Sequence, residues 1–186
     1  MASYSTKGLD HLGLISGMNK ELSIAKLIDK ALPEQSDDKL ISYGQLVEAM
    51  ILNGLGFVGR TLHMYPQYFK ERPVERKGIK AEYINDDALG RCLDKLYDAG
   101  VSGIYQTLSA SVVKHLELPC EGINLDSTSI HVDGNYEHDE DSKAVKLVRG
   151  YSRDHRPELN QVVLNLITEN KAGIPVYMQA ASGNIN

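Results

Sequence analysis

Asp126 is the residue whose type and position point most directly to chemistry. It lies within residues 123–132, where apolar, hydroxyl-bearing and β-branched residues alternate and predict a strand. Burying a carboxylate in such a strand costs free energy, so an acid there usually has a cation, a metal or a hydrogen-bonded role. The alternative is an Asp that faces solvent on a half-exposed strand, and position alone does not separate the two.

Two stretches concentrate cations that could bind phosphate. Residues 70–80 contain five bases and two acids, and residues 150–157 contain two Arg, one His, one Asp and one Tyr. Guanidinium and imidazole groups can bind phosphate oxygens, whereas the alternative for both stretches is a solvated polar loop. The candidate DNA-binding residues are Arg72, Arg76, Lys77, Arg149, Arg153, His155 and Arg156.

Other patterns indicate structure rather than chemistry. Residues 54–59 read G-x-G-x-x-G, but they follow a capped helix instead of joining a strand to a helix, so we interpret them as a helix end. The acids between positions 137 and 141 lack the glycine-turned spacing of a calcium loop and predict a solvated loop. Cys92 and Cys120 are too far apart for a zinc site, and we expect both to be buried thiols.

The composition restricts the class of protein. The 186 residues are 42% hydrophobic and 24% charged, which excludes a collagen-like or wholly disordered chain. The net charge of −5 argues against a surface that binds nucleic acid everywhere, so any DNA contact should come from local patches. There is neither an apolar run of the roughly 18 residues that a membrane span needs nor a leader-like N-terminus, so we expect a cytoplasmic protein.

The spacing of apolar residues predicts an α+β fold with two parts. Helical periodicity and cap residues predict four helices at about 22–32, 43–55, 86–100 and 102–116, with a capping box formed by Ser42 and Gln45. After Pro119 the period becomes strand-like at 123–132, 161–168 and 174–181, although a short helix is the alternative for 161–168. We therefore expect a helical N-terminal domain over 1–118 and a second domain over 119–186.

Three segments together resemble a known family. They are LDSTSIHVDG at 125–134, GYSRDHRPELNQVVLNLI at 150–167 and GIPVYMQAASGN at 173–184. In this order they resemble the start of the catalytic domain of bacterial insertion-sequence transposases of the DDE type. Residues from about 8 to 113 resemble the helical N-terminal domain of unknown function that precedes this core in one branch of the family.

The resemblance implies an RNase H-like core that is incomplete in this chain. Asp126 matches the first catalytic Asp, which in the family helps to hold two Mg²⁺ or Mn²⁺ ions for DNA strand cleavage and transfer. The family's second Asp and its Glu would lie beyond Asn186. The resemblance therefore implies a truncated transposase that binds metal weakly and does not cleave DNA alone, with the helical domain serving DNA-end binding or dimerisation.

The implied partners are the DNA ends of the element and either a second copy or a full-length transposase, with no membrane partner. Two other functions stay open at this point. One is a non-catalytic DNA-binding or dimerising fragment that modulates transposition, and the other is a small metal-dependent nuclease.

Overall fold

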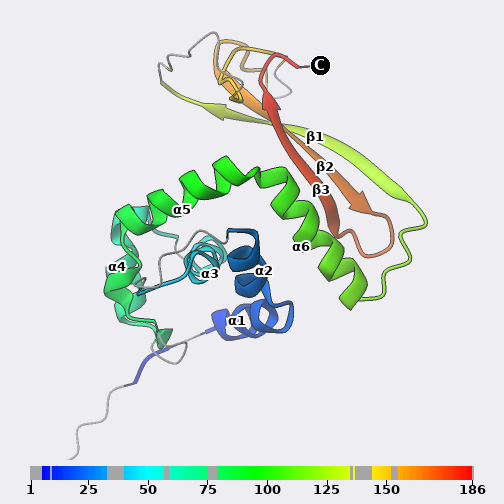
Figure 1. Ribbon diagram of the computed structural model, residues 1–186. Helices are drawn as coiled ribbons and strands as arrows, with labels where there is room; N and C mark the ends of the chain where they lie inside the picture. Colours follow the sequence, from blue (N-terminus) through cyan, green and yellow to red (C-terminus); the bar gives the residue numbers. More distant parts are fainter. Residues whose placement is uncertain are drawn as a thin grey trace, which may run out of the picture. The chain divides into compact units, whose positions relative to one another are not determined.

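The computed structural model divides the chain into two compact units, Met1–Ile104 and Tyr105–Asn186, which are described separately (Figure 1). The expected α+β layout is confirmed, because helices occupy the N-terminal part and a three-stranded antiparallel sheet follows. The structure describes residues 6–8, 10–32, 40–56, 59–74, 79–134, 136, 144–151 and 155–185. None of the helices in these ranges is long and apolar enough to cross a bilayer.

The first unit consists of helices and short 3₁₀ turns. Its elements are α1 (Leu12–Glu21), α2 (Ile24–Ala31), α3 (Tyr43–Gly54), η1 (Leu62–Met64), α4 (Tyr65–Lys70), η3 (Ala81–Tyr83) and α5 (Asp86–Ala99). Helix α6 (Val101–His115) begins in this unit and continues into the second. The predicted boundary at 118/119 marks instead the change from helix to strand.

Side-chain caps explain why two of these helices begin where the sequence predicts. Ser42 Oγ accepts the N–H of Gln45 at 3.1 Å and the Gln45 side chain accepts the N–H of Ser42 at 2.9 Å, which confirms the capping box of α3. Asn85 Oδ1 accepts the N–H of Ala88 at 2.9 Å at the start of α5. Helices α1 and α4 were not predicted, and neither has a side-chain cap at its start.

The core of the first unit is apolar and centred on aromatic rings. Phe69 is 1% exposed, and its ring meets those of Tyr65 and Tyr68 edge-on at centroid distances of 5.8 and 4.8 Å. Helices α2 and α3 approach so closely that a Cβ on Gly44 would lie 2.1 Å from the carbonyl oxygen of Ala25. Cys92 is buried as expected, whereas Cys120 is exposed, which corrects the expectation that both thiols are buried.

Tyr65 and Tyr68, two of the buried tyrosines, differ in their hydrogen bonding. Burial raises the pKa of Tyr65, and a hydrogen bond with the Asn53 side chain opposes this rise. The hydroxyl of Tyr68 is buried without a hydrogen-bond partner among the described residues, and it lies where a Cβ on Gly56 would come within 2.5 Å.

Tyr68→Phe should therefore leave the free energy of unfolding unchanged or raise it by up to about 1 kcal/mol, because it removes a buried group with no partner. Tyr65→Phe is the matched control and should cost about 1 kcal/mol through its lost hydrogen bond. Urea unfolding followed by circular dichroism measures both, and a larger loss for Tyr68→Phe than for Tyr65→Phe would contradict this assignment.

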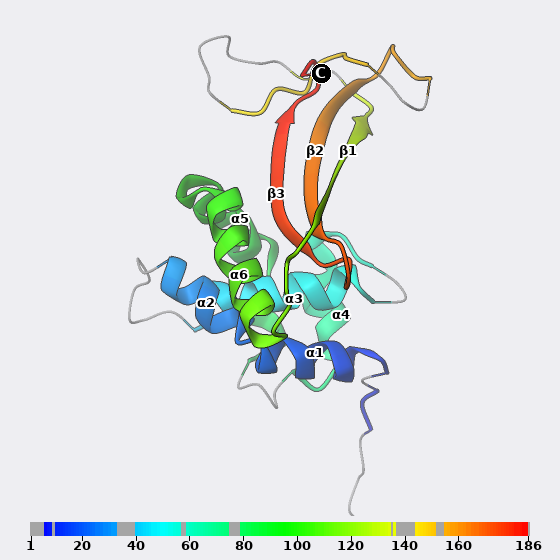
Figure 2. The same ribbon diagram turned by 90° about the vertical axis from the view of Figure 1, so that its right-hand side faces the viewer.

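The second unit is built on three antiparallel strands that lie side by side (Figures 1 and 2). They are β1 (Ile123–Val132), β2 (Asn160–Glu169) and β3 (Pro175–Ser182), in the order β1-β2-β3. Strand β1 pairs with β2 without interruption, whereas the pairing of β2 with β3 shifts register between Ile167 and Thr168. Tyr105 of α6 donates its hydroxyl to the Pro175 carbonyl at 3.3 Å.

This unit has almost no apolar core of its own within the described ranges. Ala181 is its one buried hydrophobic side chain there, and its other buried side chains are the polar Ser109, Gln161 and Glu169. Leu125, the third residue of β1, is 71% exposed, and the apolar residues of β2 are only half-buried. The sheet is therefore held mainly by hydrogen bonds.

Glu169 closes the β2–β3 hairpin. Its side chain is fully buried, and its two carboxylate oxygens accept the N–H groups of Lys171 at 2.9 Å and Ala172 at 2.7 Å. The N–H groups of Ala172 and Lys171 lower the pKa of this carboxyl below its ordinary value of 4.5, and desolvation opposes them only in part.

Glu169 should make the stability of the sheet depend on pH. A lowered pKa in the folded state means that the stabilisation is complete above the unfolded pKa of about 4.5 and is lost as the pH falls through the folded value. The difference in unfolding free energy between wild type and Glu169→Gln, measured by urea titration, should thus be larger at pH 7 than at pH 3. Glu117→Gln, which replaces an exposed acid of the same unit, is the control variant.

Candidate functional site

Asp126 lies on the surface of the sheet rather than inside it. It occupies the fourth position of β1, directly opposite Leu166 of β2, and is exposed. Because side chains alternate along a strand, its neighbours on the same face of β1 are Asn124 and Thr128. The outward-facing alternative considered from the sequence is thus the one that the structure shows.

The donor set around Asp126 does not form a metal site. Nowhere in the described ranges do three His, Cys, Asp or Glu side chains come close enough together to hold a metal ion. The acids at 137–141 lie outside those ranges. A pair of Mg²⁺ ions requires several oxygen ligands, so Asp126 with the described neighbours does not fit the two-metal centre that the family resemblance implies.

A groove of about 500 Å³ that the sequence did not indicate lies mainly on the other face of the sheet, although Thr128, on the face of Asp126, also contributes to its lining. It is lined by Leu125, Ser127, Thr128, Ser129, Tyr151, Val163, Asn165 and Ile185. Ser127 Oγ donates to Asn165 Oδ1 at 2.6 Å across this groove. Hydroxyl and amide groups thus alternate with exposed apolar side chains on this face, whereas Asp126 projects from the opposite one.

The cations of the 149–157 segment lie at the surface. Arg149, His155 and Arg156 are exposed, whereas Arg153 falls in 152–154, outside the described residues. Arg156 forms an ion pair with Glu158, and this pair raises the pKa of the Arg156 guanidinium and lowers the pKa of the Glu158 carboxyl. The structure therefore presents Arg149, His155 and Arg156 to solvent near one end of the sheet.

Three chain segments meet at this end of the sheet. Val148 and Gln161 exchange main-chain hydrogen bonds at 3.0 and 3.3 Å, and the N–H of Gly183 donates to the Lys146 carbonyl at 3.3 Å. A Cβ on Gly150 would lie 1.7 Å from the Gly183 carbonyl oxygen. Glycine is thus required where these main chains touch. Figure 1 shows the C-terminal end of β3 beside the segment that precedes β2.

Gly183→Ala should disrupt this contact, because its Cβ would lie 2.2 Å from the Gln161 carbonyl oxygen and 2.3 Å from that of Val148. Overpacking of this kind costs about 1–3 kcal/mol. The control is Gly90→Ala in α5, where a Cβ would meet nothing within 4 Å and should stabilise the helix by about 0.5–1 kcal/mol. Denaturation followed by circular dichroism distinguishes the two, and a neutral Gly183→Ala would contradict the close contact.

The basic stretch 70–80 of the first unit is only partly available to a ligand. Arg72 stacks on the Tyr68 ring at 3.6 Å and donates to the Tyr68 carbonyl at 2.8 Å, which orients its guanidinium along α4. Arg76 and Lys77 lie outside the described residues. Lys70 and Lys80, which were not among the candidate residues, line a groove of about 610 Å³ together with Pro66, Gln67, Ala81 and Glu82.

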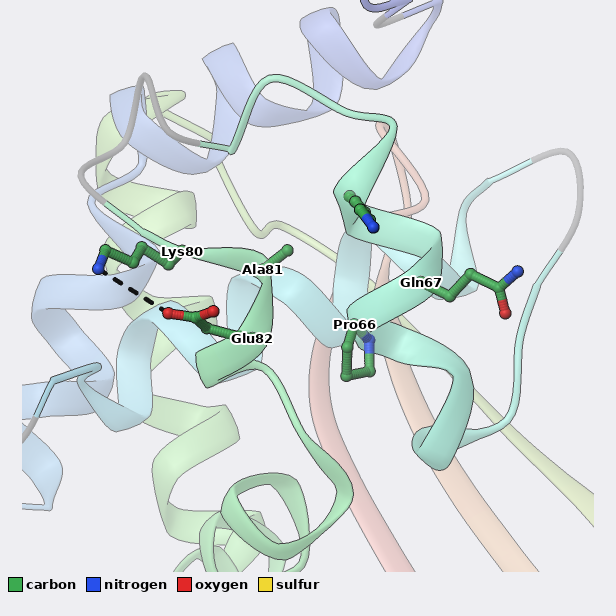
Figure 3. Close-up of a pocket in the computed structure, with 6 residues that line it drawn as sticks. Pro66, Gln67, Lys80, Ala81 and Glu82 are labelled. Carbon is green, nitrogen blue, oxygen red and sulfur yellow. Dashed lines mark ion pairs between the residues drawn. The ribbon is translucent and has the colours of Figure 1, made fainter.

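Figure 3 shows this groove between α4 and η3, with Lys80 turned toward Glu82. Their charged groups are 3.8 Å apart. A hydrogen bond with Tyr83 and then the charge of Glu82 raise the pKa of Lys80. A second groove next to Gln67 and Lys70 adds Lys7, a cation that is distant in sequence and that the pattern of the stretch could not reveal.

The comparison with protein families identifies the helical part. Residues 4–110 match the model of a family described as a domain of unknown function, DUF4277. No curated protein and no solved structure matched the chain.

Proposed function

The chain belongs to the DUF4277 family, and we propose that it is part of a DDE-type insertion-sequence transposase that binds the DNA ends of its element. In this proposal the helical unit is the N-terminal domain and β1–β3 are the first strands of an RNase H-like core. Its place is then the nucleoid, where the DNA lies. The single observation that supports the proposal is the uninterrupted antiparallel pairing of β1, the strand that contains Asp126, with β2.

The strand order supports this interpretation. Each of the three transposase-like segments of the sequence contributes one strand, and the strands pair in chain order as β1-β2-β3. The region that precedes them matches a family model that begins and ends close to the predicted helical domain. The motifs and the topology thus agree, although they come from different properties of the chain.

In the complete core that the family resemblance implies, Asp126 would be one of several metal ligands, and the described residues do not supply the others. Two divalent ions, once bound, supply the stabilisation of the attacking and leaving oxygens of a phosphodiester. Asp126 alone cannot hold both, so strand cleavage requires further carboxylates next to it. We therefore propose DNA binding without cleavage as the activity of the described residues.

Arg149, His155 and Arg156 would contact the DNA backbone. They are exposed, and cations of this kind position a protein on DNA irrespective of sequence. Arg72 is less suitable, because it is half-buried and its guanidinium stacks on the Tyr68 ring, whereas Arg156 stays exposed in its pair with Glu158. Substitution of Arg149, His155 or Arg156 is thus a better test of DNA contact than substitution of Arg72.

Replacing Arg149 and Arg156 together by Ala should weaken binding to all duplexes alike. Each lost phosphate contact should reduce the slope of log K against log salt concentration by about 0.9. A gel-shift salt titration measures the slope for wild type and variant. The control replaces the exposed cations Arg91 and Lys114 by Ala, which removes the same charge elsewhere and should leave the slope unchanged.

Equal slopes for wild type and the Arg149/Arg156 variant would remove DNA contact from this segment. Failure of the wild type to bind any duplex at low salt would overturn the proposed function itself.

A further inference from the structure

Gln161 is an almost fully buried amide in a unit that buries little else. Its side chain is 1% exposed, and its Nε2 group donates to the Tyr151 carbonyl at 3.0 Å and to the Gly183 carbonyl at 2.9 Å. Tyr151 precedes it by 10 residues and Gly183 follows it by 22. One side chain thus binds two main-chain segments that are distant in sequence.

The chemistry of this position favours glutamine over other side chains. Both groups that face Nε2 are acceptors, so the position needs two hydrogens on one uncharged nitrogen, which a primary amide supplies. Lys or Arg would bring a buried charge, and Met or Leu would leave two carbonyls without this donor. The amide oxygen of Gln161 has no hydrogen-bond partner in the described part of the chain, which indicates that the two donors are what the position uses.

The amide acts together with the main chain around it. Gln161 also exchanges hydrogen bonds with Val148 through its own N–H and carbonyl, so residues 148 and 151 are both held from this one position. Lys146 continues the attachment, because its N–H donates to Ser182 Oγ at 3.0 Å. Arg149 lies between these attachments, and the segment that leaves Tyr151 leads to His155 and Arg156.

We propose that Gln161 is the positioning residue for Arg149. Its amide fixes the main chain at Tyr151 against the end of β3, its main chain pairs with Val148, and Arg149 between them is thereby held where it can contact phosphate. This inference rests on the proposed DNA binding but adds a residue that does not itself touch DNA. Tyr151 is 76% exposed, so packing of its own side chain does not hold its main chain in place.

Hydrogen exchange of the wild type tests the attachment without any substitution. The side-chain amide protons of Gln161, followed by NMR, should exchange at least about tenfold more slowly than those of Gln179, an exposed glutamine on β3. Equal exchange rates for the two side chains would overturn the proposal.

Gln161→Met tests the consequence, because it retains the length of the side chain and removes the donors. Amide exchange should accelerate about tenfold or more in residues 146–151 and stay unchanged in α3 and α5. The salt slope of DNA binding should fall as far as when Arg149 alone is replaced by Ala, and adding that substitution to Gln161→Met should lower it no further. Gln179→Met is the matched control and should change neither property.

The outcomes separate this inference from the proposed function. Faster exchange in 146–151 with an unchanged salt slope would overturn the positioning role while leaving DNA binding intact. A wild type that binds no duplex would overturn the DNA contact and the positioning role together. The exchange rate of the Gln161 side-chain amide would then test only its hydrogen bonds to Tyr151 and Gly183. Gln161→Asn, which has the same donors on a shorter side chain, replaces Gln161→Met if that variant does not fold, and it should give an intermediate acceleration.

Discussion

The hydrogen-bonded ladder between β1 and β2 is the interaction on which the sheet unit depends. It runs over ten residues of each strand, while the described part of this unit buries one apolar side chain, Ala181. Buried polar side chains therefore stabilise the ends of this ladder, where other sheets rely on apolar packing. Glu169 binds two N–H groups at one end of the ladder and Gln161 binds two carbonyls at the other. Asp126 lies on this ladder, and Gln161 at its end binds the residues on either side of Arg149.

The helical unit is organised by the opposite principle. Its interior is formed by apolar and aromatic side chains around Phe69, and its helices approach closely enough to require Gly44 between α2 and α3. A buried polar group need not form a hydrogen bond there, since the hydroxyl of Tyr68 has no partner among the described residues. One of the candidate DNA-binding residues packs against this core, because the Arg72 guanidinium stacks on the Tyr68 ring. The first unit thus has a hydrophobic core of its own, whereas the second relies on main-chain pairing for order.

The sequence predicts those features that depend on neighbours along the chain. The Ser42 cap, the Asn85 cap and the three strands follow from local spacing, and the structure confirms them. The role of Gln161 could not be predicted, because its partners are 10 and 22 residues away and a glutamine before VVLNLIT resembles an ordinary strand end. The close contact of Gly150 with Gly183 was missed for the same reason. Asp126 was found by its type, but its exposure depends on strand pairing that spacing does not reveal.

The uninterrupted pairing of β1 also restricts how this region can change in length. Side chains on a strand alternate between its faces, so inserting or deleting one residue between Gly122 and Asp126 would move the carboxylate to the face of the Ser127–Asn165 groove. Changes of two residues would preserve its face but shift its partner on β2 away from Leu166. Strand β3 is under a weaker constraint, since its pairing already absorbs a register shift between Ile167 and Thr168. Evolutionary variation in length should therefore be tolerated on the β3 side of the sheet and rejected within β1.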